Sequence, residues 1–72
     1  MMETTRKNLI FLRKQRKLSQ SDLALLMNVS QGTVSNWESR KTKLDIELVK
    51  NLCDFFKVDF CEVVNSNLKD NI

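Results

Sequence analysis

Hydrophobic and polar positions follow a helical period over residues 20–38, and the period breaks once. Leu23 and Met27 are four residues apart, whereas Val34 and Trp37 are three apart, so each pair lies on one face of a helix. Polar residues fill most of the remaining positions. The pattern therefore predicts two short helices that cross at a tight turn.

Start and stop signals bound these two helices. Ser19 and Asp22 form a Ser-x-x-Asp variant of the capping box, and Ser30 can cap a second helix through its hydroxyl. Asn28 stands where the first helix must end in a left-handed residue, which asparagine tolerates best among the non-glycine residues. The predicted helices cover residues 20–27 and 31–39.

The rest of the chain is also predicted to be helical, which gives an all-α, five-helix domain. Ile46, Val49 and Leu52 share a helix face, and Asp45 and Asp59 are suitable N-caps. The expected elements are helices over 4–16, 20–27, 31–39, 45–56 and 59–65, with a loop over 40–44. We expect one domain over residues 1–65 and a short polar tail over 66–72 that frays.

The segment from Leu18 to Glu38, LSQSDLALLMNVSQGTVSNWE, resembles the helix-turn-helix of lambda-repressor-like transcriptional regulators of the Cro and XRE type. The similarity continues upstream and downstream, so it covers roughly residues 5–65. The resemblance implies a compact five-helix DNA-binding fold, with the helix-turn-helix formed by the second and third helices.

Glycine is scarce where this family often has it. Lys17, Asn28, Arg40 and Lys57 occupy such positions, whereas the one glycine of the chain, Gly32, falls inside the second helix of the motif. If Lys17 and Lys57 are left-handed, each costs about 1 kcal/mol relative to glycine.

Charge is distributed unevenly along the chain. Residues 1–43 carry nine basic and three acidic side chains, a net +6, whereas residues 44–72 carry three basic and six acidic ones, a net −3. Basic clusters flank the helix-turn-helix on both sides, where they can meet phosphates, while the carboxyl third would face away from DNA. A solvated basic face is the alternative, but it does not explain why the clusters bracket the motif.

Base reading is expected from the third helix, lying in the major groove of double-stranded DNA. Gln31 and Asn36 can each bond an adenine through N6 and N7, worth about 1 to 3 kcal/mol of discrimination. The resemblance places base-reading positions on Gln31, Gly32 and Asn36. Because Gly32 has no side chain, close backbone approach or a shape effect would replace its contact. The expected base-reading residues are Gln31, Gly32, Thr33 and Asn36.

Phosphate contacts are expected from the start of the second helix and from the basic loop after the third. The resemblance places a phosphate-binding glutamine at Gln20, and it pairs Arg13 with Glu38. Capping is the alternative role of Ser19, and a merely solvated loop is the alternative for the basic segment. The expected phosphate-contacting residues are Arg13, Ser19, Gln20, Ser30, Ser35, Arg40, Lys41, Thr42 and Lys43.

Apolar residues of the last helix exceed what its docking requires. A single recognition helix reads only a few base pairs, so we expect a homodimer on an inverted repeat, with the recognition helices about one DNA turn apart. The expected interface consists of Phe60, Val63 and Val64. Core packing is the alternative explanation for these side chains.

Several other kinds of site are not expected. The chain has no histidine, and Cys53 and Cys61 are too few and too far apart for a zinc site. Cys53 is expected to be buried, and Cys61 to be exposed as a reduced thiol or, alternatively, in an intermolecular disulfide. No cofactor or small-molecule effector site is evident. Without histidine, a Gly-rich phosphate loop or a nucleophile with a base, an enzyme is not expected.

The absence of a membrane-length apolar run and of a signal-peptide pattern predicts a cytoplasmic protein without membrane partners.

Two function classes follow from the sequence observations. The first class is a sequence-specific transcriptional regulator, most simply a repressor. The alternative is an antitoxin or adaptor domain whose main partner is another protein.

Overall fold

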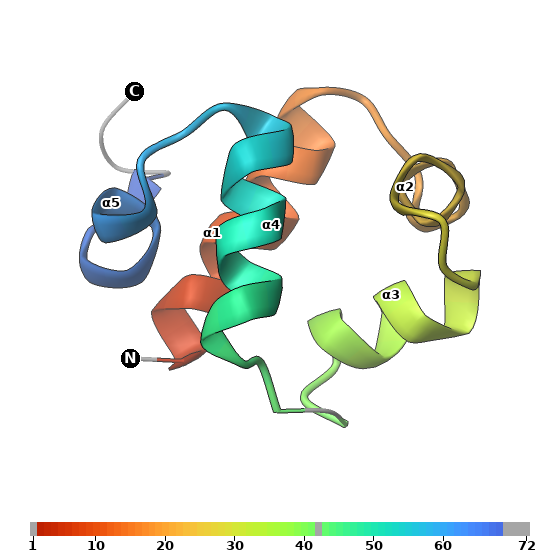
Figure 1. The fold of residues 1–72 in the computed structure, drawn as a ribbon, viewed down its shortest axis with the longest axis horizontal. Helices are drawn as coiled ribbons and strands as arrows, with labels where there is room; N and C mark the ends of the chain where they lie inside the picture. The colour runs from red at the N-terminus through yellow and green to blue at the C-terminus, as the bar shows by residue number, and fades with distance from the viewer. Residues whose placement is uncertain (1, 42, 69–72) are drawn as a thin grey trace.

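The fold consists of five helices and no strand over residues 2–41 and 43–68, the parts of the chain that the computed structural model describes. The elements are α1 (Met2–Gln15), α2 (Gln20–Met27), α3 (Gln31–Glu38), α4 (Ile46–Phe56) and α5 (Phe60–Asn65) (Figure 1). The predicted all-α class and order of helices are confirmed. The largest difference from the expected bounds is at α1, which begins two residues earlier than predicted.

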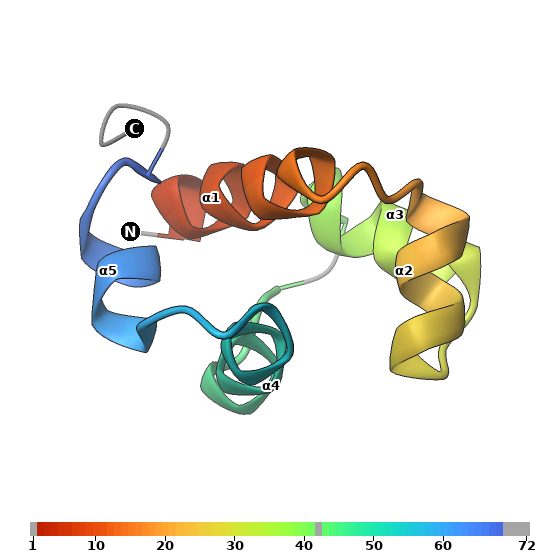
Figure 2. The same ribbon diagram turned by 90° about the horizontal axis from the view of Figure 1, so that it is seen from above.

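The helices are arranged along a long axis of 29 Å, with α5 at one end and α2 at the other (Figures 1 and 2). α1 runs through the middle and packs against both α3 and α5. α2 packs against α3, and α4 packs against α5. The two helices of the predicted motif therefore form one end of the molecule, attached to the remainder mainly through α1.

The start of α2 and the turn between α2 and α3 form as the sequence predicts. Ser19 Oγ accepts a hydrogen bond from the Asp22 amide at 2.9 Å, and the Ser19 amide donates to Asp22 Oδ2 at 2.9 Å. These bonds lower the pKa of the Asp22 carboxyl, first through the Ser19 backbone and then through its side chain. Asn28 is left-handed with φ of 61°, and Ser30 Oγ accepts from the Thr33 amide at 3.1 Å.

The hydrophobic core gathers residues from every helix. Val34 and Trp37 of α3 are buried in it, so the helix face that these two residues share points into the core. Cys53 is also buried, and burial raises the pKa of its thiol, with smaller contributions from Asp54 and Asp59. The buried apolar residues are Leu9, Leu12, Leu23, Ala24, Val34, Trp37, Leu44, Val49, Leu52, Cys53, Phe56 and Val63.

Two arginines, one in α1 and one directly after it, donate to backbone carbonyls of other helices, Arg6 from a buried position and Arg16 from an exposed one. Arg6 is buried and donates from Nη1 to the carbonyl of Trp37 near the end of α3. Arg16 donates from Nη2 to the backbone carbonyl of Phe56 at 2.6 Å. The guanidinium carbon of Arg16 lies 4.9 Å from the centroid of the Phe56 ring. These two basic side chains therefore have partners within the protein.

Asn8 fastens the end of the described chain to α1. Its Nδ2 donates to the carbonyls of Val63 and Ser66, both at 2.6 Å, and its Oδ1 accepts from the Leu68 amide at 3.0 Å. Asn8 is buried, and Leu68 packs against the core. The expectation that the tail frays is therefore wrong for residues 66–68, while residues 69–72 lie outside the described part.

Lys17 and Lys57 both have φ of 58°, in the left-handed region, as the resemblance implied. Replacing either by glycine should stabilise the domain by about 1 kcal/mol, because glycine adopts this conformation without a steric penalty. Urea denaturation of each variant measures the difference. As a control, Lys50→Gly in the exposed middle of α4 should destabilise by about 1 kcal/mol. Equal losses in all three variants would contradict the assigned strain.

Candidate nucleic-acid interface

The exposed side of α3 carries the residues predicted to read bases. Gln31 and Gly32 are exposed, while Thr33, Ser35 and Asn36 are half-buried. Because α3 is anchored by two buried side chains of its opposite face, its polar face is held outward on a rigid element. The structure thus places all four predicted base-reading residues on one short helix.

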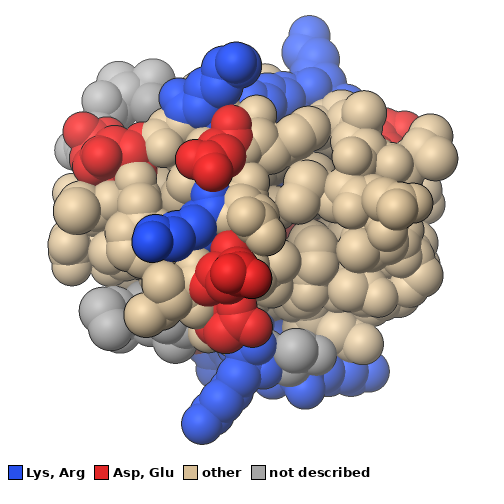
Figure 3. All heavy atoms as spheres, viewed as in Figure 1, with Lys and Arg blue, Asp and Glu red and all other residues tan. Residues whose placement is uncertain are grey.

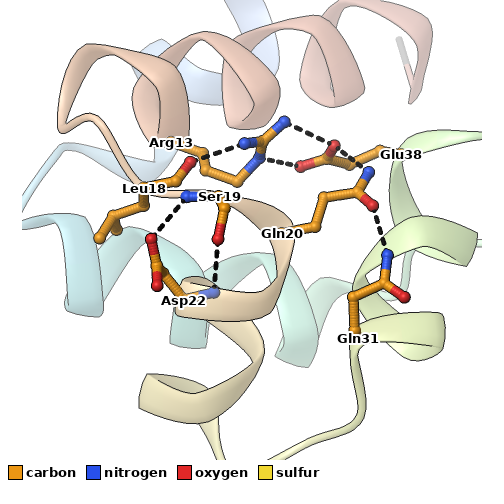
Figure 4. A network of polar contacts seen from close by, with 7 residues as sticks. All are labelled: Arg13, Leu18, Ser19, Gln20, Asp22, Gln31 and Glu38. Carbon is orange, nitrogen blue, oxygen red and sulfur yellow. Dashed lines mark hydrogen bonds and ion pairs between the residues drawn. The ribbon is translucent and has the colours of Figure 1, made fainter.

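A chain of polar contacts leads from the interior to the first residue of this helix (Figure 4). Arg13 Nε donates to Glu38 Oε2 at 2.7 Å, and Arg13 Nη2 donates to Glu38 Oε1 at 3.1 Å. Gln20 Nε2 donates to Glu38 Oε1 at 2.9 Å, and Gln31 Nε2 donates to Gln20 Oε1 at 2.7 Å. The amide of Gln31 is therefore oriented by a network that begins in α1.

Arg13 occupies an internal position in this network. Only 9% of its side chain is exposed, and its Nη1 also donates to the carbonyl of Leu18 at 2.7 Å. The pairing with Glu38 that the resemblance implied is present. The predicted phosphate contact of Arg13 stays a prediction, and little of the guanidinium surface is accessible for it.

The hydroxyls at the two helix starts have local partners. Ser19 and Ser30 are both N-caps, so the capping role proposed as the alternative for Ser19 is realised. The hydroxyls of Ser30 and Thr33 lie 2.8 Å apart and are hydrogen-bonded to each other. A base contact through the Thr33 hydroxyl would therefore either replace its hydrogen bond to Ser30 or be made in addition to that bond.

Gly32 is not required by the fold. Its φ is not positive, and a Cβ built at this position would meet nothing nearer than Ser30 Oγ at 3.9 Å. A helix with glycine near its start is less stable than the same helix with alanine, because glycine loses more backbone freedom on folding. The protein itself therefore supplies no reason for glycine at this exposed position.

The basic segment after α3 lies at the surface. Arg40, Lys41 and Lys43 are exposed, and Arg40 forms an ion pair with Glu3 of α1. Thr42, which was predicted to join them, lies outside the described residues. Figure 3 shows basic atoms along the upper and lower edges of the molecule, and mostly uncharged surface with one acidic patch on the side of α2 and α3.

The helix predicted to mediate dimerisation is partly used for core packing. Val63 is fully buried in the single chain, so its assignment to the interface is corrected: no second copy can reach it. Phe60 and Val64 are half-buried and pack against the core while keeping part of their surface accessible. Cys61 of the same helix is exposed.

Among residues 2–41 and 43–68, no three histidine, cysteine or acidic side chains are grouped so that they could hold a metal ion. None of the described helices combines the length and the hydropathy that crossing a membrane requires.

Known proteins provide an independent comparison. The helix-turn-helix family model matches residues 9–63, more than half of the chain. Among curated proteins, the chain is similar to the antitoxin PezA of Streptococcus pneumoniae serotype 4 (strain ATCC BAA-334 / TIGR4), with 28% identity over 61 residues. That match covers 85% of this chain and 39% of PezA, so the chain spans about two fifths of this relative's length. No solved structure gives a significant match.

The Arg13–Glu38 pair generates a stability prediction. The two side chains are 9% and 12% exposed, so Glu38→Ala leaves a buried guanidinium without its carboxylate and should cost roughly 3 kcal/mol. Thermal and urea unfolding measure this loss. The matched control is Glu3→Ala, which breaks the exposed pair with Arg40 and should cost less than about 1 kcal/mol. Similar small losses in both variants would show that the buried pair does not hold the helices together.

Proposed function

The chain belongs to the Cro/XRE-type helix-turn-helix family of DNA-binding regulators, and on that premise we propose that it is a sequence-specific transcriptional regulator, most simply a repressor. The observation that carries the proposal is the polar face of α3, whose first residue is held in place by the Arg13–Glu38–Gln20 network. In this proposal the protein binds double-stranded DNA as a homodimer on an inverted repeat.

Gln31 and Asn36 are the proposed adenine readers. A primary amide presents one donor and one acceptor in the geometry that N7 and N6 of adenine require. Gln31 is fixed through its bond to Gln20, which leaves its Oε1 and its second Nε2 proton for a base. A side chain already held in one rotamer loses less conformational entropy on binding, and that supports Gln31 as a specific reader.

Phosphates would be bound on both sides of α3. The first intrahelical bond of α2 runs from the Leu23 amide to the Ser19 carbonyl, so the amides of Gln20 and Ser21 emerge at the helix start, where an anion is favoured. Arg40, Lys41 and Lys43 would form the second clamp. Arg13 takes part indirectly in this proposal, by fixing Glu38 and thereby Gln20.

Gly32 would allow the backbone of α3 to approach the DNA closely. The position is exposed and has space for a Cβ, so the fold does not account for the glycine. Close contact of the α3 backbone with a base edge or a thymine methyl would account for the glycine. A side chain at position 32 would hold α3 away from the floor of the groove.

Dimerisation is proposed to use the accessible parts of Phe60 and Val64 on α5. These two residues flank the buried Val63, which fixes α5 on the core and thereby positions its outer surface. An interface at this end of the molecule leaves α2 and α3 free at the other end (Figure 2).

A protein-partner function is the second candidate, and the similarity to PezA favours it. PezA is named an antitoxin, and the match covers 39% of its length. In this alternative the chain would act chiefly by binding another protein, with DNA binding secondary.

Selection from a randomised duplex library at near-physiological salt tests the main proposal. Recovery of an inverted repeat with half-sites about ten base pairs apart is the expected result. Salt-sensitive binding without enrichment of any sequence would instead favour the protein-partner function, because phosphate contacts alone carry no sequence information.

Variants of Asn36 and Lys43 separate base reading from phosphate binding. Asn36→Ala should weaken binding chiefly to the selected repeat, by about 1 to 3 kcal/mol. Lys43→Ala should weaken selected and random duplexes alike and lower the salt slope by about one unit. Fluorescence anisotropy titrations on both duplexes at several salt concentrations measure these effects. Identical losses on both duplexes for Asn36→Ala would remove it from the reading set.

Gly32→Ala should have opposite effects on folding and on DNA binding. Alanine is expected to stabilise the free protein by up to about 1 kcal/mol, because it restricts the unfolded chain and meets open space in the fold. The same methyl group should weaken binding to the selected repeat. Unfolding curves and anisotropy titrations of the one variant provide both measurements. A stabilised variant with unchanged DNA affinity would rule out close approach at Gly32.

A further inference from the structure

Four side chains form an unbroken series of hydrogen bonds from α1 to the exposed start of α3 (Figure 4). The side chains of Arg13 and Glu38 are 9% and 12% exposed, Gln20 is half-buried, and Gln31 is exposed. We call these four residues the relay. Its inner end is an ion pair with two hydrogen bonds, and its outer end is a residue proposed to read a base.

Glu38 can only accept hydrogen bonds, and this fixes the direction of the bonds that follow it in the relay. An ionised carboxylate has no proton to donate, whereas a primary amide has a donor end and an acceptor end. Both Glu38 oxygens accept from Arg13, and Oε1 also accepts from Nε2 of Gln20 at 2.9 Å. Gln20 therefore turns its Oε1 toward α3, where it accepts from Nε2 of Gln31 at 2.7 Å. The polarity of both amides thus follows from the acidic residue at the end of α3.

The polarity of the Gln31 amide decides what this side chain presents to a base. One Nε2 proton is used on Gln20, so one Nε2 proton and Oε1 remain. The major-groove edge of adenine has one acceptor, N7, and one donor, the N6 amino group, so both remaining groups are satisfied. Guanine has two acceptors, N7 and O6, so its O6 would face Oε1 of Gln31 without a proton between them. A reversed amide would present two protons, which suits guanine.

We propose that Glu38 is a specificity-determining residue, which acts through Gln20 to hold Gln31 in the polarity that matches adenine and opposes guanine. The inference rests on the proposed DNA-binding function and deepens it. Glu38 is a positioning residue, since its oxygens are bonded to Arg13 and Gln20.

The relay resists reversal at each step. Turning the Gln31 amide to suit guanine would bring its Oε1 against Oε1 of Gln20, two acceptors without a proton. Gln20 cannot turn to relieve this contact, because its own Oε1 would then face the Glu38 carboxylate. Binding guanine through a reversed Gln31 therefore costs at least one hydrogen bond of the relay. This cost falls on guanine alone, so it adds to the preference for adenine.

Selections from a randomised duplex library measure the base preference at each position of the recovered site. Gln31→Ala identifies the position that Gln31 reads, because the preference should disappear there. At that position the wild-type protein should favour adenine over guanine on the order of ten- to a hundredfold. In Glu38→Gln the new amide can donate to Gln20 as well as accept from it, so this ratio should fall by about fivefold, the value of one hydrogen bond.

Gln20→Met is a second test, which leaves the Arg13–Glu38 pair in place and decides the question if Glu38→Gln does not fold. Methionine is a good helix former, so α2 should still form, while Gln31 loses the acceptor that orients it. Affinity for all duplexes should fall, since Gln20 is also a proposed phosphate contact. The ratio of adenine to guanine does not depend on that uniform loss, and it should fall as in Glu38→Gln.

Two controls separate polarity from charge and from affinity. Glu47→Gln removes an exposed carboxylate in the first turn of α4, and it should change neither the affinity nor the ratio. Lys43→Ala should lower the affinity for all duplexes and retain the wild-type ratio, because a phosphate contact carries no sequence information. Thermal unfolding of each variant shows that the folded protein is being compared.

The outcomes distinguish this inference from the proposed function. A wild-type ratio of adenine to guanine in either folded variant, Glu38→Gln or Gln20→Met, would overturn the role of Glu38 and leave sequence-specific binding intact. Equal relaxation at every position of the site would also overturn it, by showing a general loosening of α3. The same holds if Gln31→Ala alters no position. If the wild-type protein selected no sequence at all, the proposed function itself would fail.

Discussion

The Arg13–Glu38 pair is the interaction on which the rest of the structure depends. It joins α1 to the end of α3 within a largely enclosed space, and both carboxylate oxygens are used. The same carboxylate accepts from Gln20 at the start of α2, while the guanidinium donates to the Leu18 carbonyl before that helix. One ion pair thus fixes three helices relative to one another. A charge-assisted, two-pronged contact is suited to this task because it is directional as well as strong.

α1 acts as a scaffold whose polar side chains complete the ends of other helices. The last carbonyls of a helix have no partner within it and must find donors elsewhere. Arg6 donates to Trp37 near the end of α3, Arg16 donates to Phe56 at the end of α4, and Asn8 donates to Val63 in α5. In the described part of the chain, no buried polar side-chain atom lacks a hydrogen-bond partner. The arrangement explains how a small core tolerates so many polar groups.

Local signals in the sequence were sufficient to predict the helix-turn-helix, but not to predict which polar side chains lie in the interior. The bounds of α2 were predicted because Ser19, Asp22 and Asn28 act on their immediate neighbours. The buried positions of Arg6 and Arg13 were not predicted, because charged side chains are mostly found at the surface. Their spacing carried a usable signal: Arg6 precedes Leu9 by three residues and Arg13 follows it by four, which places them on its face of α1. The contact between Gln20 and Gln31 depends on the crossing of two helices, which periodicity does not specify.

The bonds of Asn8 give the fold a temporal order. Asn8 can bind Val63, Ser66 and Leu68 only after residues 63–68 have been synthesised, so these contacts of α1 form later in synthesis than the helix itself. A contact of this sequence separation closes the chain into a loop, whose entropic cost must be met before the contact stabilises anything. A ribosome-bound nascent chain would therefore have its helix-turn-helix residues present well before the scaffold that orients them is complete. Completion of the scaffold would consequently wait for the synthesis of residues 63–68.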